Sequence, residues 1–558
     1  MTDFPLPHWT AEITETFVTG EDMLGVEGSA QAYQQEYIPG IITVTDRARY
    51  YSFYAWVLYR YIHMPGSTLL MDDFKGEFFR RHEMAFLLAA FSHHYPESIL
   101  SGLIGSGVNS YKVRGWWEKQ DPVSLDTHYF ENKLGGFGQY YNTVMKAMGI
   151  IADPENSKVV YRLTDRGNAL AEAYEQSIQN TKYLQELNKE GVVTWLKHTD
   201  ATDLGQVSCI CPPALTSGGD LPLLRNAFFR FDQRGEQNPH VLRRQALGLA
   251  LEIVEKGNGA YTFDMLRQVL YLGEYSEGSP YIPSSELTDI AQRWRMVEVR
   301  HLFTFGLQAL WAAFLLHLSN QPQGMSLEQY LNWATKTLST ETFSSPLGSY
   351  LSELCIANHL PGSWGDQHQN FDTACRTSSP ENELFLFVRA TSHKSDPAEL
   401  LRIGTRILSQ HFLRFLVLHE TKDKIWLDMA NRLRLPMTGY FNEMQRYLES
   451  SDWKVGDWLS WIYRQYILGQ HQYMALEKLR YQGYDTFKFL HRDGRFYWPF
   501  SKQNTYREPI RLAANRMSNA TTMLIDLGMI DSQDGSHLFL TDDGETALQQ
   551  IKDGRFDS

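Results

Sequence analysis

Apolar and aromatic residues recur at helical spacing along most of the chain. In the segment 43–62 they stand three or four positions apart, and aromatic side chains occupy most of the remaining faces. A helix that is apolar nearly all round is a buried one. We expect this helix to have Thr43 or Thr45 as its N-cap and to end at the Pro-Gly pair of 64–66, because Pro and Gly interrupt helical backbone.

The same periodicity predicts amphipathic helices over 241–255 and 399–418. The short run ELFLFV at 383–388 is compatible with a lone strand. No regular alternation of strand and helix patterns appears along the chain. The fold class we predict is therefore mainly α, as a multi-domain helical protein, and not a doubly wound α/β protein.

The longest apolar stretch is LFTFGLQALWAAFLLHL at 302–318. It is short for a membrane span, contains Gln308 and His317, and is followed directly by polar residues. We interpret it as a buried core helix and expect no membrane contact. The start of the chain carries acids and prolines where a signal peptide has a basic end and an apolar run.

Two segments far apart in the chain resemble each other. TVMKAMGII at 143–151 corresponds to TMLIDLGMI at 522–530, and LTDRGNAL at 163–170 corresponds to LTDDGETAL at 540–548. Each copy predicts a helix that ends at a glycine, a polar excursion, and a second helix after the Leu-Thr-Asp sequence. This order resembles the winged-helix module of bacterial regulators, which has a recognition helix, a two-stranded wing and a closing helix. The resemblance implies two winged-helix (α+β) modules.

These patterns predict four consecutive parts of the chain. They are an N-terminal helical domain at 1–128, a winged-helix-like module at 129–182, one or more helical middle domains at 183–477, and a C-terminal winged-helix-like module at 478–558.

Charge argues against a generally nucleic-acid-binding protein. The 558 residues include 52 Lys plus Arg and 65 Asp plus Glu, for a net charge of −13. The expected recognition helix of the C-terminal copy, 518–527, has no Arg or Lys, although phosphate neutralisation supplies much of the affinity for DNA. Met523, Leu524 and Met529 favour contact with another protein there. DNA contact stays open through Arg507, Arg511, Arg516 and Asn519.

Arg47 and Arg49 stand at the expected start of the helix over 43–62. Two cations beside the positive end of a helix dipole are unfavourable, so a negative group must compensate them. One interpretation is a buried ion pair with an acid of the chain, aided by Asp46. The other is an anion or nucleic-acid site, in which the arginines bind phosphate and neighbouring aromatic rings stack on bases.

The residues around this helix carry a family resemblance. Leu24-Gly25-Val26, Pro39-Gly40, and Thr45-x-Arg47-Ala48-Arg49-Tyr50 followed by Trp56 are similar to the start of an uncharacterised family of large bacterial proteins. That family has a PGxSxxxTRARYxxFxxW block, and here Asp46 is inserted between the Thr and the Arg. Some members lie in genomic islands of anti-phage defence genes, beside helicases or ATPases, so the resemblance implies a role in defence without implying a chemistry.

Catalytic motifs are sparse. The sequence has no Walker A motif, and neither a nucleophile elbow nor His-Glu-x-x-His occurs convincingly. Arg406 and His411 have the Arg-x4-His spacing of a class of helical ribonucleases, in which the His acts in acid–base chemistry and the Arg steadies phosphate. They are weak catalytic candidates, because similar pairs one residue wider recur elsewhere in the chain.

Cysteine usage indicates a reducing compartment and predicts no metal. Four cysteines in a chain of this length cannot form a disulfide framework, so we expect a cytoplasmic protein. Cys209-x-Cys211 lacks a second pair at zinc-binding spacing, and His93-His94 stands at a predicted helix end, where a cap or surface position is expected. We therefore expect no metal site and no cofactor.

Together these observations favour a non-enzymatic scaffold or adaptor subunit of a bacterial anti-phage defence complex. The expected partners are proteins of the same gene cluster, namely an ATPase, helicase or nuclease, with DNA left open as a further partner. The alternatives are a metal-independent helical ribonuclease-type effector and a winged-helix DNA-binding regulator.

Overall fold

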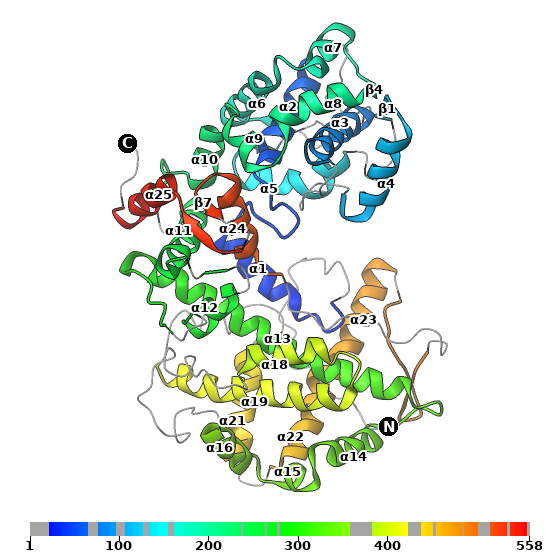
Figure 1. Ribbon diagram of the computed structural model, residues 1–558. Helices are drawn as coiled ribbons and strands as arrows, with labels where there is room; N and C mark the ends of the chain where they lie inside the picture. The colour runs from blue at the N-terminus through cyan, green and yellow to red at the C-terminus, as the bar shows by residue number, and fades with distance from the viewer. Residues whose placement is uncertain are drawn as a thin grey trace. The chain divides into compact units, whose positions relative to one another are not determined.

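The computed structural model shows a mainly α protein, as predicted (Figure 1). It describes residues 22–64, 76–95, 106–126, 132, 134–153, 161–235, 238–259, 261–262, 265–275, 279–357, 382–421, 437–449, 453–483, 485–499, 514–532 and 536–554.

The chain divides into two compact units, and each unit is assembled from segments far apart in the sequence. Unit 1 comprises segments within 1–33, 264–282 and 291–513, whereas unit 2 comprises segments within 34–263, 283–290 and 514–558. This division differs from the four consecutive parts predicted from the sequence. The end of the chain joins unit 2 through tertiary contacts that span hundreds of residues, which local patterns do not reveal.

Unit 2 is built around α2 (Arg49–His63), whose side chains are buried on nearly all faces. The predicted buried helix is thus confirmed, but it begins later than predicted, because the Thr45 hydroxyl accepts a hydrogen bond from the backbone of Ile42 (3.1 Å) instead of capping the helix. The other helices of this unit are α3 (Gly76–His94), α4 (Ser106–Lys119), the π-helical η2 (Phe137–Tyr141), α5 (Asn142–Ala147), α6 (Asp165–Ile178), α7 (Lys182–Glu190), α8 (His198–Ser208), α9 (Pro212–Thr216), α10 (Leu221–Phe229), α11 (Pro239–Gly257), the 3-10 helix η4 (Ser285–Leu287), α24 (Arg516–Asp526) and α25 (Asp542–Lys552).

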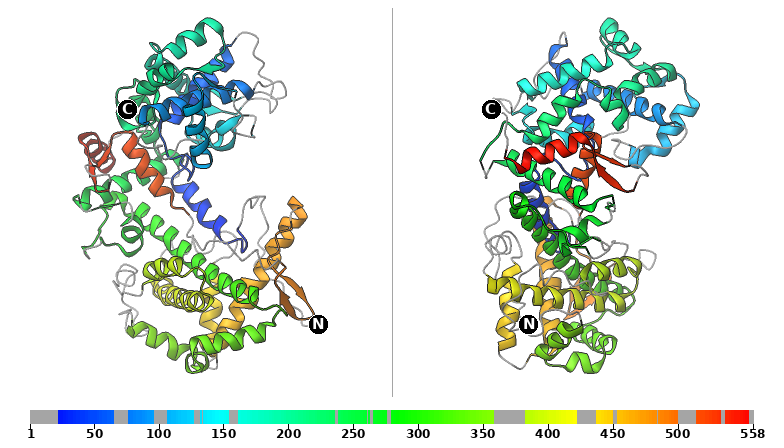
Figure 2. Two further views of the ribbon diagram at one scale, coloured as in Figure 1. Left: turned by 45° about the vertical axis from the view of Figure 1, so that its right-hand side comes forward. Right: turned by 60° about the vertical axis from the view of Figure 1, so that its left-hand side comes forward.

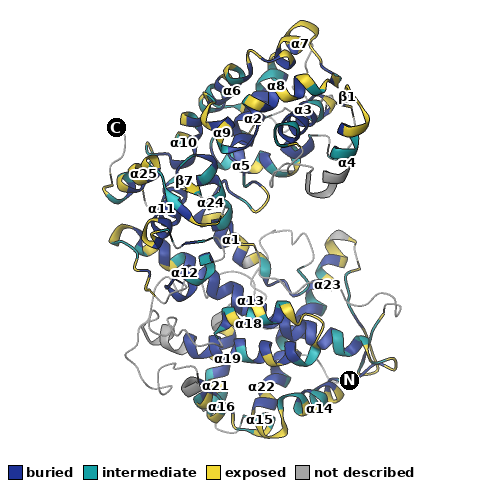
Figure 3. Cartoon of the chain, in the orientation of Figure 1, coloured by how far each residue is buried: buried dark blue, intermediate teal, exposed yellow. Residues whose placement is uncertain are grey.

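Unit 1 is centred on α13 (Thr288–Ser319), most of which belongs to it. This helix contains the apolar stretch 302–318 and is long and apolar enough to cross a membrane, but 78% of its apolar window is buried inside the protein (Figure 3). That burial is typical of a core helix of a soluble protein and confirms the interpretation as core. The remaining helices of unit 1 are α12 (Leu266–Leu272), α14 (Leu327–Leu338), α15 (Thr340–Ser344), α16 (Leu347–Ala357), α18 (Glu383–Ser392), α19 (Pro397–Thr421), α21 (Met437–Glu449), α22 (Val455–Ile462), the π-helical η5 (Tyr463–Leu468) and α23 (Gly469–Gln482), while α1 (Glu27–Tyr37) has residues in both units.

The strands are short, and those within the described residues form two-stranded antiparallel sheets. The pairs are β1 (Val123–Ser124) with β4 (Trp195–Leu196), β2 (Ile151–Ala152) with β3 (Arg162–Leu163), β5 (Leu490–Arg492) with β6 (Arg495–Tyr497), and β7 (Ile530–Ser532) with β8 (Leu538–Leu540).

The internal repeat is confirmed as a helix–hairpin–helix unit that occurs twice in unit 2. Ile151 pairs with Leu163 between α5 and α6, and Ile530 pairs with Leu540 between α24 and α25. Figure 2 shows the second hairpin beside α24 and α25. That either copy is a winged helix stays a prediction.

Both copies use the same cap for the second helix. Thr164 accepts a hydrogen bond from the backbone N–H of Gly167 (3.2 Å), and Thr541 accepts one from Gly544 (3.1 Å). Each hydroxyl also donates back to the glycine that ends the first helix, which ties the hairpin closed. Those acceptors are the carbonyls of Gly149 at 2.8 Å and Gly528 at 2.7 Å.

Gly544→Ala is expected to lower the free energy of unfolding of unit 2 by about 1–3 kcal/mol, because the added Cβ would collide with the backbone carbonyl oxygen of Met529. Urea denaturation followed by circular dichroism measures the change. Gly115→Ala is the matched control: it lies within α4 with no atom within 4 Å of the new Cβ, and alanine should stabilise that helix. Equal midpoints for the two variants would contradict the close approach at Gly544.

Candidate metal centre

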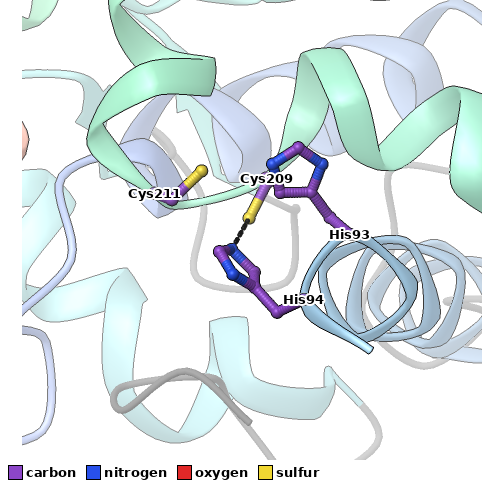
Figure 4. Close-up of side chains that lie close together, drawn as sticks. All are labelled: His93, His94, Cys209 and Cys211. Carbon is purple, nitrogen blue, oxygen red and sulfur yellow. Dashed lines mark hydrogen bonds between the residues drawn. The ribbon is translucent and has the colours of Figure 1, made fainter. Parts of the chain in front are cut away.

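Two histidines and two cysteines come together in unit 2. His93 and His94 are the last residues of α3, and Cys209 and Cys211 lie in the connection from α8 to α9 (Figure 4). One ligand atom from each of the four side chains lies within 4.8 Å of the others, and Cys209 Sγ is 3.4 Å from His94 Nε2. Both cysteines are buried and both histidines are half-buried. The set therefore offers two sulfur and two nitrogen ligands at one point.

Close packing of α3 against α8 brings the two pairs together. At Gly205 of α8, a Cβ atom would collide with the backbone oxygen of Ala89 in α3 and would lie 3.2 Å from the Cβ of His93. Glycine thus allows the two backbones to approach where α3 ends. The histidine rings meet nearly at right angles, with centroids 4.8 Å apart.

The cysteine loop is held from behind by the two arginines at the start of α2. Arg47 donates to the carbonyl of Ile210 (2.8 Å), and Arg49 donates to the carbonyls of Cys209 (3.4 Å) and Ala214 (2.8 Å). These bonds fix the backbone on both sides of Cys211, so the arginines help to position the cysteine side chains.

One of the two cysteines is disposed to be a thiolate. A hydrogen bond from Cys209, together with the backbone N–H of Ala214 and the His94 side chain, lowers the pKa of Cys211 against the opposing effect of burial. The same sharing raises the pKa of Cys209. A deprotonated sulfur is the form that binds metals.

Arg47 and Arg49 are both occupied by internal carboxylates. Arg47 makes two hydrogen bonds to Asp526 of α24 (2.9 and 2.8 Å), and the backbone N–H of Ala48 donates to the same carboxylate (2.9 Å). Arg49 lies 3.2 Å from Asp220, and both of these side chains are fully buried. Of the two interpretations, the buried ion pair is the one observed, with Asp526 and Asp220 as the partners, and the charge of Asp46 also acts favourably on Arg47. The hypothesis of an external anion site at Arg47 and Arg49 is corrected accordingly.

Asp526 supplies a negative charge of the kind that the two arginines at the start of α2 require. Its carboxylate caps α2 through the Ala48 N–H and neutralises Arg47 beside the positive helix end. Burial raises the pKa of Asp526 to about 6, against the lowering effect of Arg47, so the group is still mostly ionised at neutral pH.

Of the residues suggested for DNA contact, the two that the structure describes, Arg516 and Asn519, are not exposed. Arg516 is buried at the start of α24, where burial lowers its pKa to about 10 and its guanidinium donates to the carbonyl of Ile41 (3.4 Å). Asn519 is half-buried and donates to the carbonyl of Thr43 (3.4 Å). Arg507 and Arg511 lie outside the described residues.

The expected recognition helix is packed into unit 2. No residue of α24 is exposed, and seven of its eleven residues are buried. Met523, Leu524 and Met529 are buried too, which corrects the expectation that they form a surface for another protein. Their contacts are made within the chain.

The ribonuclease candidate is also internal, in unit 1. His411 in α19 is 1% exposed, and its ring nitrogens lie 3.1 Å from the carbonyl oxygens of Ile407 and Val299. Burial lowers the pKa of His411. Because five helical residues turn through about 140°, Arg406 projects from a different face of the helix. The pair therefore does not form a shared site open to a substrate.

The sequence did not predict this set of four ligands, because the histidine pair and the cysteine pair are more than a hundred residues apart. The Cys-x-Cys and His-His pairs are each too common to indicate a site alone, and only the packing of α3 on α8 unites them. The useful signal was that His93-His94 stands at a predicted helix end.

Comparisons of the chain with protein-family models, with curated proteins and with solved structures found no match.

Proposed function

We propose that this chain is a non-enzymatic scaffold or adaptor subunit of a bacterial anti-phage defence complex, and that it holds an ATPase, helicase or nuclease encoded beside it. The observation that carries the proposal is that the candidate functional charged residues are buried and bind other residues of the same chain. The candidate phosphate-binding arginines and the candidate catalytic histidine, where the structure describes them, are buried in contacts within the protein. The proposed role in defence rests on the resemblance of residues 24–62 to the uncharacterised family of large bacterial proteins.

Exposed apolar side chains support an adaptor. On α18 Phe385 and Val388 are 47% and 59% exposed, and on α23 Leu476 and Leu479 are 57% and 43% exposed. Apolar side chains that are exposed close together often mark contact with another protein. Such surfaces suit a subunit that works by holding a partner.

A phage challenge with the intact gene cluster tests this function. Deleting the gene should abolish protection, and the tagged chain should co-purify with one product of a neighbouring gene in equal amount. The purified chain should leave labelled DNA and RNA intact with and without Mg²⁺, and should bind a DNA duplex no more tightly than about 10⁻⁶ M at physiological salt, the range of non-specific binding.

Arg406→Ala serves as the internal control. It should retain protection and the melting temperature of the parent chain, since the proposed function needs no catalytic arginine. Nucleic-acid cleavage that this substitution abolishes, with the melting temperature unchanged, would replace the adaptor with an effector nuclease. Tight, sequence-selective duplex binding would replace it with a regulator.

A further inference from the structure

We propose that His93, His94, Cys209 and Cys211 bind one zinc(II) ion, which fastens the end of α3 to the loop between α8 and α9. The inference stands on the geometry of unit 2 and is independent of the proposed adaptor function. The four ligand atoms come from two places in the chain that are more than a hundred residues apart in the sequence. The ion would therefore act as a cross-link within the unit.

The observed distances are close to those of a tetrahedral zinc site. With Zn–S bonds of about 2.3 Å and Zn–N bonds of about 2.0 Å, neighbouring sulfur and nitrogen ligands are roughly 3.5 Å apart, and two sulfur ligands are roughly 3.8 Å apart. Cys209 Sγ and His94 Nε2 are already separated by 3.4 Å, and no pair exceeds 4.8 Å. Small side-chain rotations suffice to close the set around one ion.

The charge of the surroundings suits a dication bound by two thiolates. Two cysteine thiolates cancel the double charge of zinc, so the buried centre is neutral overall. The nearby cations do not disturb this balance, because Arg47 is paired with Asp526 and Arg49 with Asp220. The arginines instead hold the carbonyls of Cys209 and Ile210, as outer groups that orient ligands do in metal sites.

The ligand chemistry selects zinc over other metals. Two sulfur and two imidazole ligands in a tetrahedral arrangement are typical of zinc, whereas magnesium and calcium require oxygen ligands. A two-iron cluster with two Cys and two His places the histidines on one iron and the cysteines on the other. The direct contact between Cys209 and His94 fits a single shared ion.

The ligand set also indicates what the ion does. Four protein ligands fill the tetrahedron and leave no position for water or substrate, which is the arrangement of structural zinc sites. The ion would therefore stabilise the packing of α3 on α8 and the shape of the cysteine loop. Through Arg47, which contacts both that loop and Asp526, the same centre supports the position of α24.

Metal analysis of the full chain, purified with a tag that contains no histidine, tests the site directly. Mass spectrometry of the metals should find about one zinc per chain. Cys211→Ser and His94→Ala should each reduce bound zinc roughly tenfold or more after dialysis, whereas His393→Ala, an exposed histidine of unit 1, and the double variant Cys355→Ser/Cys375→Ser should retain it. Cobalt(II) in place of zinc should show the intense visible bands of a tetrahedral site and a sulfur-to-cobalt charge-transfer band, which Cys211→Ser removes.

Two measurements on the unsubstituted chain guard against variants that fail to fold. A mercurial reagent that titrates thiols should release zinc in step with the modified cysteines, as followed by a zinc-sensitive dye. Removal of zinc by a chelator should increase hydrogen exchange in peptides covering 205–216 and the end of α3. No zinc in the purified or zinc-incubated chain, zinc retained by both ligand variants, or an octahedral cobalt spectrum would overturn the proposal.

Discussion

Replacing Arg49 with methionine is expected to lower the free energy of unfolding of unit 2 by about 3–5 kcal/mol. The substitution leaves the Asp220 carboxylate in a position of 0% exposure, where Ser52, at 2.5 Å, is the hydrogen-bond partner still in place. It also removes the donors to the carbonyls of Cys209 and Ala214. An uncompensated buried charge with broken backbone contacts is among the most destabilising single changes in a protein core. Urea denaturation followed by tryptophan fluorescence gives the change in free energy.

The matched control is Arg60→Met, in the same helix. Arg60 pairs with Glu175 at 3.4 Å, but those side chains are 23% and 30% exposed, so its loss should cost less than about 1 kcal/mol. Adding Asp220→Asn to Arg49→Met should restore part of the stability, because the orphaned charge is then removed. If Arg49→Met and Arg60→Met are equally mild, the pair with Asp220 is not a stabilising feature of unit 2.

The sequence predicted that Arg47 and Arg49 need negatively charged partners, but it did not identify Asp526 and Asp220 as those partners. Two arginines at a helix start predict a compensating negative charge by electrostatics alone. Which of 65 acids supplies it depends on tertiary packing, and Asp526 stands 479 positions away from Arg47. Asp526 lies within the expected recognition helix 518–527, and its observed role is to neutralise Arg47 and cap α2.

Local patterns succeeded where the determinants of structure are local. The Leu-Thr-Asp-x-Gly sequence predicted both hairpin units, because the Thr cap and the crowded glycine lie within a few residues of each other. The run ELFLFV illustrates the opposite case, since it begins helix α18 and is not a strand. There Asn382 caps the helix by accepting from the Phe385 N–H (2.9 Å), and burial of Glu383 and Leu386 on one face follows helical spacing.

The candidate metal centre marks the limit of inference from spacing. A zinc site whose ligands lie close together in the sequence can be recognised from their intervals. Here each half contributes two adjacent or nearly adjacent ligands, and the interval between the halves carries no information. The deciding feature is the close approach of α8 to α3 at Gly205, which no single-sequence pattern reports.

Glu383→Gln is expected to destabilise unit 1 by about 3–5 kcal/mol at neutral pH. Glu383 is fully buried and binds Arg414 through two hydrogen bonds, at 2.6 and 2.9 Å, with His411 Nδ1 at 3.8 Å. Arg414 is 3% exposed and stacks over the ring of Tyr271, so a neutral amide in place of Glu383 removes the charge–charge attraction of a buried ion pair. Peptide-resolved hydrogen exchange assigns the loss to α18 and α19.

The same carboxylate should make unit 1 labile to acid. Burial alone raises the pKa of Glu383, but the charge and hydrogen bonds of Arg414 outweigh it and hold the pKa at about 2, below the ordinary value of 4.5. The unfolded chain therefore takes up the proton first as pH falls. The stabilisation is fully present above about pH 4.5 and is lost progressively toward pH 2, by roughly 3 kcal/mol in all.

Glu383→Gln should remove this part of the pH dependence, because the amide does not titrate. The control is Glu443→Gln, because Glu443 pairs with Arg446 at 3.8 Å and both of these side chains are exposed. This substitution should leave the free energy of unfolding within about 1 kcal/mol of that of the parent chain. The free energy of unfolding is measured at several pH values between 2 and 7 by urea titration. A parent chain and a Glu383→Gln variant whose stabilities fall in parallel below pH 4.5 would show that Arg414 does not hold Glu383 ionised, and the fixed contact between α18 and α19 would need another explanation.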